Sequence, residues 1–228
     1  MGGPRSKYWT SSNRGRMDKP RWVERLGTLL AVAMVALFAL LLAAQIDLEN
    51  AQDQLHNQEQ LLDKLQSEIQ EGQDELERLR ELAPFAAAIN KHRPDVNPWA
   101  LAAQLVESSR RWAGERWEQV AWDAVAMGAV ESRWQTRAIG SCGEKGPLQV
   151  MPSTARWLGV RDLDDWRATI DAAVRYYARV CLPRAGGDTR TAVAVYNAGA
   201  SRGLDTARRL ASRHVERVWA AREAIGRG

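Results

Sequence analysis

The 228-residue sequence has only three histidines, His56, His92 and His214, and they are widely scattered. It contains no His-Glu-x-x-His pair, no phosphate-binding Gly-x-x-x-x-Gly-Lys loop and no Gly-x-Ser-x-Gly turn. Those motifs supply zinc ligands, contacts to nucleotide phosphates and an activated serine. Metal, nucleotide and serine-nucleophile chemistry therefore have no support in the sequence, which predicts no cofactor.

Alternating strand patterns are also scarce, whereas apolar residues at helical spacing run through residues 85–228. Val120, Ala124 and Met127 share one face of a predicted buried helix, and Glu131 follows at the same spacing. The sequence predicts a mainly α domain of about 140 residues, large enough to bury its own core. The expected helices begin at Pro98 and cover 118–130, 153–158, 164–181, 190–195 and 203–225.

Positive and negative charges are not spread evenly along the chain. The net charge is +5 over residues 1–25, −8 over 26–84 and +7 over 85–228. Residues 26–44 carry no charge at all, and a helix rising about 1.5 Å per residue over this run nearly spans a hydrocarbon core of roughly 30 Å. We interpret 26–46 as a transmembrane helix. A cleaved signal peptide is the alternative, but its cleavage site needs small residues where Leu41 and Leu42 stand.

The positive-inside rule gives this span an orientation, because its basic flank is N-terminal. Residues 1–25, low in aliphatic side chains, are expected to form a disordered basic tail in the cytoplasm, next to the anionic headgroups of the lipid bilayer. Everything after the span then lies outside the cytoplasm. Charge alone is weak evidence for nucleic acid binding, and no nucleic acid partner is expected.

A heptad pattern follows the apolar span. Apolar residues recur every seven positions at Leu48, Leu55, Leu62, Ile69 and Leu76, while the accompanying series is interrupted by Gln58 and Gly72. This pattern predicts a helical stalk over 47–83 that self-associates as a coiled coil through 48–82. About 35 residues of helix would separate the remaining domain, 84–228, from the membrane by roughly 50 Å. A helix folded back on its own domain and a frayed monomeric stalk are the alternatives. Pro84 is expected to end the helix.

Glu131 closes the apolar helix predicted at 118–130. A carboxyl group in such a place is partly desolvated, which raises its pKa and suits a general acid near neutral pH. A glutamate at the end of a helix is, however, more commonly an ordinary surface residue.

Two further segments change that interpretation. Residues 143–155 read GEKGPLQVMPSTA and residues 195–199 read VYNAG. Together with Glu131 and Ser132, they resemble the lytic transglycosylase family with the goose-lysozyme-like SLT domain. That family shows Glu-Ser, then Gly-x-x-Gly-Leu-Met-Gln-x-Met-Pro-x-Thr-Ala, then Ala-Tyr-Asn-Ala-Gly. The resemblance covers 117–203, and it implies a lysozyme-like helical catalytic domain.

The resemblance also implies an activity, which is cleavage of peptidoglycan between N-acetylmuramic acid and N-acetylglucosamine to leave a 1,6-anhydro sugar. Glu131 is then the catalytic acid and base. The implied substrate-binding residues are Ser132, Gln149, Met151, Tyr196 and Asn197. Local opening of the wall in this way suits an envelope-spanning machine for secretion, conjugation or phage ejection. The expected location is the bacterial inner membrane, with one span and a periplasmic catalytic domain, or a virion if a phage encodes the chain.

Some residues depart from the family pattern. Pro147 and Leu148 replace Leu-Met, Val195 replaces alanine, and Glu144 stands where a small residue is usual. A second carboxylate leaves open a lysozyme-type hydrolase in which Glu144 or Asp123 assists a water molecule. A catalytically inactive wall-binding scaffold is the other alternative.

Cys142 and Cys181 are the only two cysteines. Outside the cytoplasm they are free to oxidise. A disulfide between them would tie the loop that carries the motif at 143–155 to the end of the helix predicted at 164–181. Two free buried thiols are the alternative.

Overall fold

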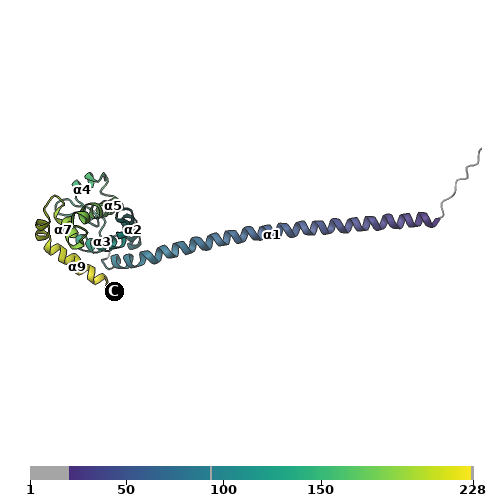
Figure 1. Ribbon diagram of the computed structural model, residues 1–228, viewed down its shortest axis with the longest axis horizontal. Coiled ribbons are helices and arrows are strands. Elements are labelled where there is room, and N and C mark those ends of the chain that lie inside the picture. The colour runs from purple at the N-terminus through teal and green to yellow at the C-terminus, as the bar shows by residue number, and fades with distance from the viewer. Residues whose placement is uncertain (1–20, 93, 227–228) are drawn as a thin grey trace, which may run out of the picture. The chain divides into compact units, whose positions relative to one another are not determined.

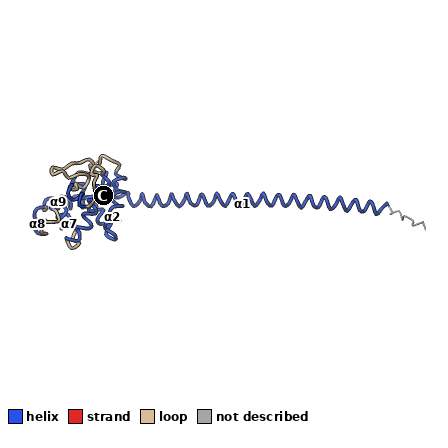
Figure 2. The backbone as a smooth tube through the Cα atoms, turned by 90° about the horizontal axis from the view of Figure 1, so that it is seen from above, coloured by secondary structure: helices blue, strands red, loops and turns tan. Residues whose placement is uncertain are grey.

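The computed structural model describes residues 21–92 and 94–226. Within them the fold is mainly helical and contains no strand, as the blue and tan tube of Figure 2 shows. Isolated bridges join Lys145 to Ile139 and to Val150. The predicted mainly α fold is therefore confirmed. Residues 1–20, which make up most of the cytoplasmic tail predicted at 1–25, lie outside the described residues.

The helices follow one another with short connections. After α1 (Arg21–Asn90) come α2 (Pro98–Ala113), η1 (Gly114–Arg116), α3 (Trp117–Glu131), α4 (Pro152–Trp157), α5 (Trp166–Tyr176), η2 (Tyr177–Cys181), α6 (Leu182–Arg184), α7 (Thr189–Ala198), α8 (Leu204–Leu210) and α9 (Ser212–Gly226). The longest connection among the described residues, 132–151, contains residues 138–151, which include most of the second motif and are called the motif loop.

The chain divides into two units, one up to Gln70 and one from Glu71 onward. Every residue of α1 from 25 to 70 is exposed, including the uncharged run 26–44. By length and composition, α1 is the one helix among the described residues that is apolar enough to cross a membrane. It is therefore a candidate membrane span, and the four-part division of the chain stays a prediction.

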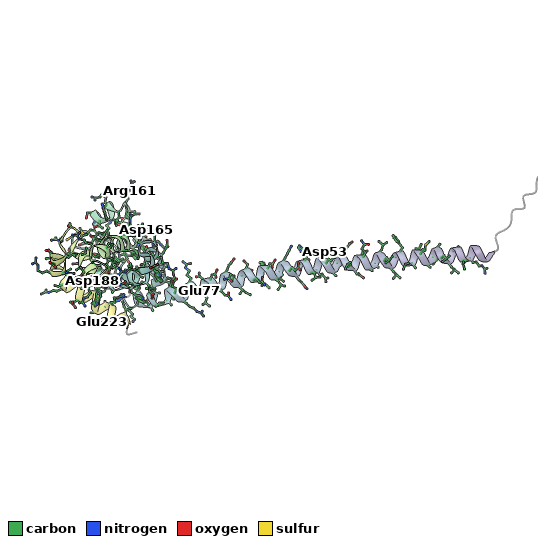
Figure 3. The ribbon with its side chains drawn as sticks, viewed as in Figure 1. Asp53, Glu77, Arg161, Asp165, Asp188 and Glu223 are labelled. Atoms are coloured by element: carbon green, nitrogen blue, oxygen red, sulfur yellow. The ribbon has the colours of Figure 1, made fainter. Side chains whose placement is uncertain are left out.

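The heptad residues of α1 are also exposed in this single chain. Leu48, Leu55, Leu62 and Ile69 each leave more than half of their surface open. Asp53 projects from the same part of the helix (Figure 3). The helical part of the stalk prediction agrees with this structure, while the coiled coil stays a prediction.

The expectation that Pro84 ends the helix is wrong, since α1 continues through it to Asn90. A proline inside a helix removes one backbone hydrogen bond and clashes with the preceding turn. Phe85, Ala86 and Ile89, however, are buried in the core of the second unit. We attribute the continuation to this burial, which favours a helical path beyond the proline.

Helix α3 lies at the centre of the second unit. It packs against α2 and α9, while α2 also packs on α5 and α7 packs on α8 and α9. Figure 1 labels α2, α3, α5, α7 and α9 within this unit. Alanines of α3, α5 and α7 are buried in the core of this unit. The fully buried large side chains include Leu101 and Leu105 of α2, Val120, Val125 and Met127 of α3, Ile170 and Val174 of α5, and Val193 of α7.

Two predicted helices differ in detail from the observed ones. The helix predicted at 164–181 is α5, capped by Asp165, followed by the wider π-helical turn η2. The stretch 203–225 forms two helices, because the chain turns at the fully buried Ala211. Helix α9 packs on the domain through Val215 and Val218, as expected for its apolar face.

A buried polar cluster joins α3, η2 and α9. Tyr177 donates a hydrogen bond to Asp123 Oδ2 at 3.0 Å, and Arg222 Nε lies 3.2 Å from Asp123 Oδ1. Asp123 is 1% exposed, and burial raises its pKa to about 6 against the opposing attraction of Arg222. The carboxylate therefore depends on Arg222 as its counter-charge.

Replacing Arg222 with methionine is expected to destabilise the chain by about 3 kcal/mol, because it leaves a buried charge without its partner. Denaturant unfolding of the full chain in detergent measures this loss, and Asp123→Asn added to Arg222→Met should recover part of it. An unfolding midpoint unchanged by Arg222→Met would contradict the assignment.

Candidate active site

The end of α3 is closed by a tight turn that fixes Glu131. The backbone N–H groups of Ser132 and Trp134 both donate to Gly128 O, at 3.2 and 3.1 Å. Arg133 and Trp134 take positive φ angles of 56° and 63°, and the fully buried Trp134 indole donates to Val125 O. Any side chain at Gly128 would collide with that indole. The turn therefore holds the last residues of α3, Glu131 included, against the core.

The motif loop is folded onto itself by backbone hydrogen bonds. Lys145 and Val150 exchange a pair of them at 3.0 Å, and Gly140 N–H donates to Glu144 O at 2.8 Å. Gly146 N–H donates to Ala138 O at 3.1 Å. These local bonds give the loop a defined backbone shape in the folded domain.

Gln149 has an unusual backbone conformation, with φ at 50°. Its neighbours Leu148 and Val150 are buried, whereas Gln149 is half-buried and lines a pocket. Its amide donates to Gly146 O at 2.9 Å and to Ala138 O at 3.4 Å. Strained non-glycine residues of this kind cluster at functional sites. The conformation places one polar side chain on the pocket while its apolar neighbours enter the core.

Two side-chain hydrogen bonds tie the loop to the helices. Ser132 Oγ donates to Pro147 O at 2.8 Å, and Tyr196 OH donates to Leu148 O at 2.9 Å. The burial of Tyr196 raises its pKa well above the ordinary value, so its hydroxyl stays protonated and remains a donor. The three sequence motifs are thus physically joined at consecutive carbonyls of the loop.

A pocket of about 260 Å³ lies where the motifs meet. It is lined by Glu131, Gly140, Ser141, Glu144, Gln149, Met151, Tyr196 and Asn197. The structure therefore brings together five of the six residues predicted for catalysis and substrate binding. Ser132 is not part of this lining, because its hydroxyl is engaged with Pro147 O and with the N–H of Gln135. Asp123, buried with Tyr177, does not line it either.

Glu131 has a strongly raised pKa in this pocket. Burial, opposed by the charge of Arg217 and aided by that of Glu144, raises the pKa of its carboxyl to about 7. Its side chain is only 16% exposed. At neutral pH a substantial fraction of Glu131 therefore carries the proton that a general acid needs.

Four residues around Glu131 were not found by the sequence analysis. His214 Nε2 lies 3.3 Å from Glu131 Oε1, and Arg217 donates to Val130 O at 3.3 Å. Gly140 and Ser141 precede the recognised motif and line the pocket. Helix α9 is more than 80 residues from Glu131 along the chain, and no motif or spacing connects the two.

The disulfide predicted between Cys142 and Cys181 is not formed in this structure, where both thiols are free. Cys142 is exposed on the motif loop, whereas Cys181 has no exposed surface at the end of η2. The two sulfurs thus occupy different environments, and only Cys142 is accessible. The alternative of two free buried thiols holds in part: both thiols are free, but only Cys181 is buried.

The described side chains contain no group of three or more His, Cys, Asp or Glu residues placed to hold a metal ion. Residues 111–216 match the family model for the transglycosylase SLT domain. The chain therefore contains a transglycosylase SLT domain, and the resemblance predicted from its motifs is confirmed. No solved structure gives a significant match to the chain. The domain supports a function of lytic transglycosylase type that acts on peptidoglycan.

The absence of a side chain at Gly140 lets the side chains of Glu144 and Gln149 pack against its backbone in the pocket wall. A Cβ atom at this position would collide with the Glu144 carboxylate and would lie 2.6 Å from Gln149 Oε1. Gly140→Ala is therefore expected to displace both side chains and to lower peptidoglycan cleavage roughly 10- to 100-fold. Gly203→Ala is the matched control, because a Cβ there meets nothing within 4 Å and φ is −62°. Equal activity of the two variants in a turbidity assay would contradict this prediction.

Proposed function

We propose that the protein is a membrane-anchored lytic transglycosylase that cleaves the β-1,4 bond between N-acetylmuramic acid and N-acetylglucosamine and leaves a 1,6-anhydro product. The observation that carries the proposal is the largely buried Glu131 in a pocket with Gln149, Tyr196 and Asn197, inside the segment matched by the SLT family. No cofactor is required, since the proposed steps are proton transfers to and from Glu131 and the exchange of one C1–O bond for another, with no change of oxidation state.

Glu131 acts twice in the proposed reaction. Its carboxyl proton passes to the glycosidic oxygen, and the bond from that oxygen to the muramoyl C1 breaks. The resulting carboxylate then takes the proton of the C6 hydroxyl as that oxygen bonds to C1. Glu131 ends protonated, as it began, and no water is consumed. A pKa of about 7 suits both steps, because neither protonation state is strongly disfavoured near neutral pH.

The remaining lining residues bind and orient the sugar. Gln149 and Asn197 present amides, and Met151, 38% exposed, offers an apolar contact to a ring face. Tyr196 and Ser132 contribute through the loop carbonyls to which they donate. In this proposal they bind substrate indirectly, by holding Gln149 and Met151 in place.

The N-terminal helix supplies the anchor and the stalk in this proposal. Residues 26–46 cross the bacterial inner membrane once, with the N-terminus in the cytoplasm and the SLT domain in the periplasm. The exposed heptad leucines within 48–82 pair with a second copy of the chain. Such a tethered enzyme opens the wall locally for an envelope-spanning machine.

One observation favours a second candidate function, a lysozyme-type hydrolase. Glu144 lines the same pocket as Glu131, so a second carboxylate is available to activate water. Asp123 is removed from this role by its burial beside Tyr177. Glu144 is therefore the residue that separates the two reactions.

Mass spectrometry of peptidoglycan digested by the full chain in detergent tests the proposed reaction. We expect muropeptides one water lighter than hydrolysis products. Glu131→Gln should lower the rate by about 10²–10⁴-fold, because it removes the general acid and base. Glu144→Gln, the matched control in the same pocket, should keep the anhydro product.

Other outcomes would overturn the proposal. Products ending only in reducing muramic acid, with a loss of activity in Glu144→Gln, would assign the hydrolase instead. Equal clearance of the wall by wild type and a correctly folded Glu131→Gln would exclude Glu131 from catalysis. Absence of peptidoglycan cleavage by the wild type would favour the remaining alternative, a catalytically inactive wall-binding scaffold.

The exposed Cys142 provides a direct test of the membrane orientation, because Cys181 is buried. A maleimide that cannot cross membranes should label the chain in spheroplasts without lysis, and Cys142→Ala should abolish the label. Labelling that requires lysis would contradict a domain outside the cytoplasmic membrane. Recovery of the chain in the soluble fraction would contradict the anchor.

A further inference from the structure

His214 places a buried ring nitrogen beside the Glu131 carboxyl group. His214 Nε2 lies 3.3 Å from Glu131 Oε1, and the two side chains are only 13% and 16% exposed. Within the described part of the chain, this nitrogen is buried and has no partner with hydrogen-bond geometry. Buried polar atoms without a partner are uncommon in folded proteins, so this atom requires an explanation.

The protonation state of His214 excludes a simple ion pair. Burial, and then the charge of Arg217, lower the pKa of His214 to about 4. The imidazole is therefore neutral near pH 7 and carries one N–H, on either ring nitrogen. When the proton is on Nε2, the ring can donate to Glu131 Oε1 after a small rotation, without adding a positive charge to the pocket.

The other charged and titratable groups around Glu131 do not offer this donor. Tyr196, from α7, donates its hydroxyl to Leu148 O. Arg217 donates to Val130 O and acts on the carboxyl only through its charge. Glu144, from the motif loop, repels the ionised form. Of the charged and titratable groups that the described residues place around Glu131, His214 is the one whose ring nitrogen can present a neutral donor to the carboxyl.

We propose that His214 is a positioning residue for Glu131, in which a neutral Nε2–H group donates to Oε1 and leaves Oε2 to exchange protons with the substrate. The inference rests on the proposed function, which makes Glu131 the acid and base. It assigns to α9 a part in the active site that no sequence motif marks.

The hydrogen bond would act at both stages of the reaction. When Oε2 gives its proton to the glycosidic oxygen, the new carboxylate keeps a donor on Oε1. When Oε2 then takes the proton of the C6 hydroxyl, the carboxyl has not rotated. His214 keeps its own proton throughout, so the proton balance of the reaction is unchanged.

The test compares His214→Phe and His214→Gln in the full chain in detergent. Phenylalanine keeps an aromatic ring, somewhat larger and without a donor, whereas the glutamine amide replaces the Nε2–H group. For His214→Phe we expect kcat to fall about tenfold or more with little change in KM, because Glu131 loses its orientation. We also expect the alkaline limb of the kcat/KM profile, near pH 7 in the wild type, to move to higher pH.

The direction of that pH shift follows from the hydrogen bond. A donor on Oε1 favours the ionised carboxylate, so its removal raises the pKa of Glu131. His214→Gln, which keeps a donor, should retain a kcat and an alkaline limb of the pH profile close to those of the wild type. Val218→Ala is the matched control on α9, one turn away and fully buried, and it should lower stability without moving the limb.

A readout independent of turnover completes the test. The side-chain carboxyl carbon of Glu131, assigned with Glu131→Gln, can be titrated by carbon NMR in wild type and His214→Phe. Identical titration curves would overturn the inference whatever the activities are. A fall in kcat with an unmoved limb would overturn it too, because only a structural effect would remain. A wild type that leaves peptidoglycan uncut would overturn the proposed function itself, before any variant is compared.

Discussion

Two hydrogen bonds from helices to the motif loop, Ser132 to Pro147 O and Tyr196 to Leu148 O, set the geometry of the pocket. The two hydroxyls donate to carbonyls of adjacent loop residues, so the loop is fixed in both position and rotation. Gln149 follows directly and turns towards the pocket with a positive φ. Together with the burial of Leu148 and Val150, these bonds hold the strained conformation of Gln149 from outside the loop. The pocket therefore depends on contacts between segments far apart in the chain.

Burial explains both the chemistry of the site and its dependence on α9. The apolar face of α3 places Glu131 at the edge of the core, where desolvation raises its pKa to about 7. The same burial lowers the pKa of His214 to about 4, so the pair is neutral at the pH where a proton must be available. Between about pH 4.5 and 7 the folded protein holds a proton on Glu131 that the unfolded chain releases, so this group makes stability fall as pH rises. His214 has the opposite effect between about pH 4 and 6.5.

Sequence reasoning succeeded where the signal is local. The periodicity of α2 and α3 and the helix at 190–195 required only neighbouring residues, and the predicted pocket residues Glu131, Gln149 and Asn197 came from three short motifs. It failed where distant packing decides. Pro84 was expected to stop a helix that the burial of Phe85 and Ile89 continues, and Ala211 divides a stretch whose pattern is unbroken. The free thiols of Cys142 and Cys181 are a third case, since residue counts carry no distances.

The sequence by itself determined the helical character of the chain, the uncharged run of residues 26–44, the heptad series and the residue types of the SLT motifs. Each of these is a property of neighbours along the chain. Only the tertiary structure decided that Ser132 binds the loop instead of lining the pocket, that Asp123 is buried away from it, and that His214 reaches Glu131. The physical reason is that burial and hydrogen-bond partners are set by segments that meet only when α3, α7, α9 and the motif loop pack together.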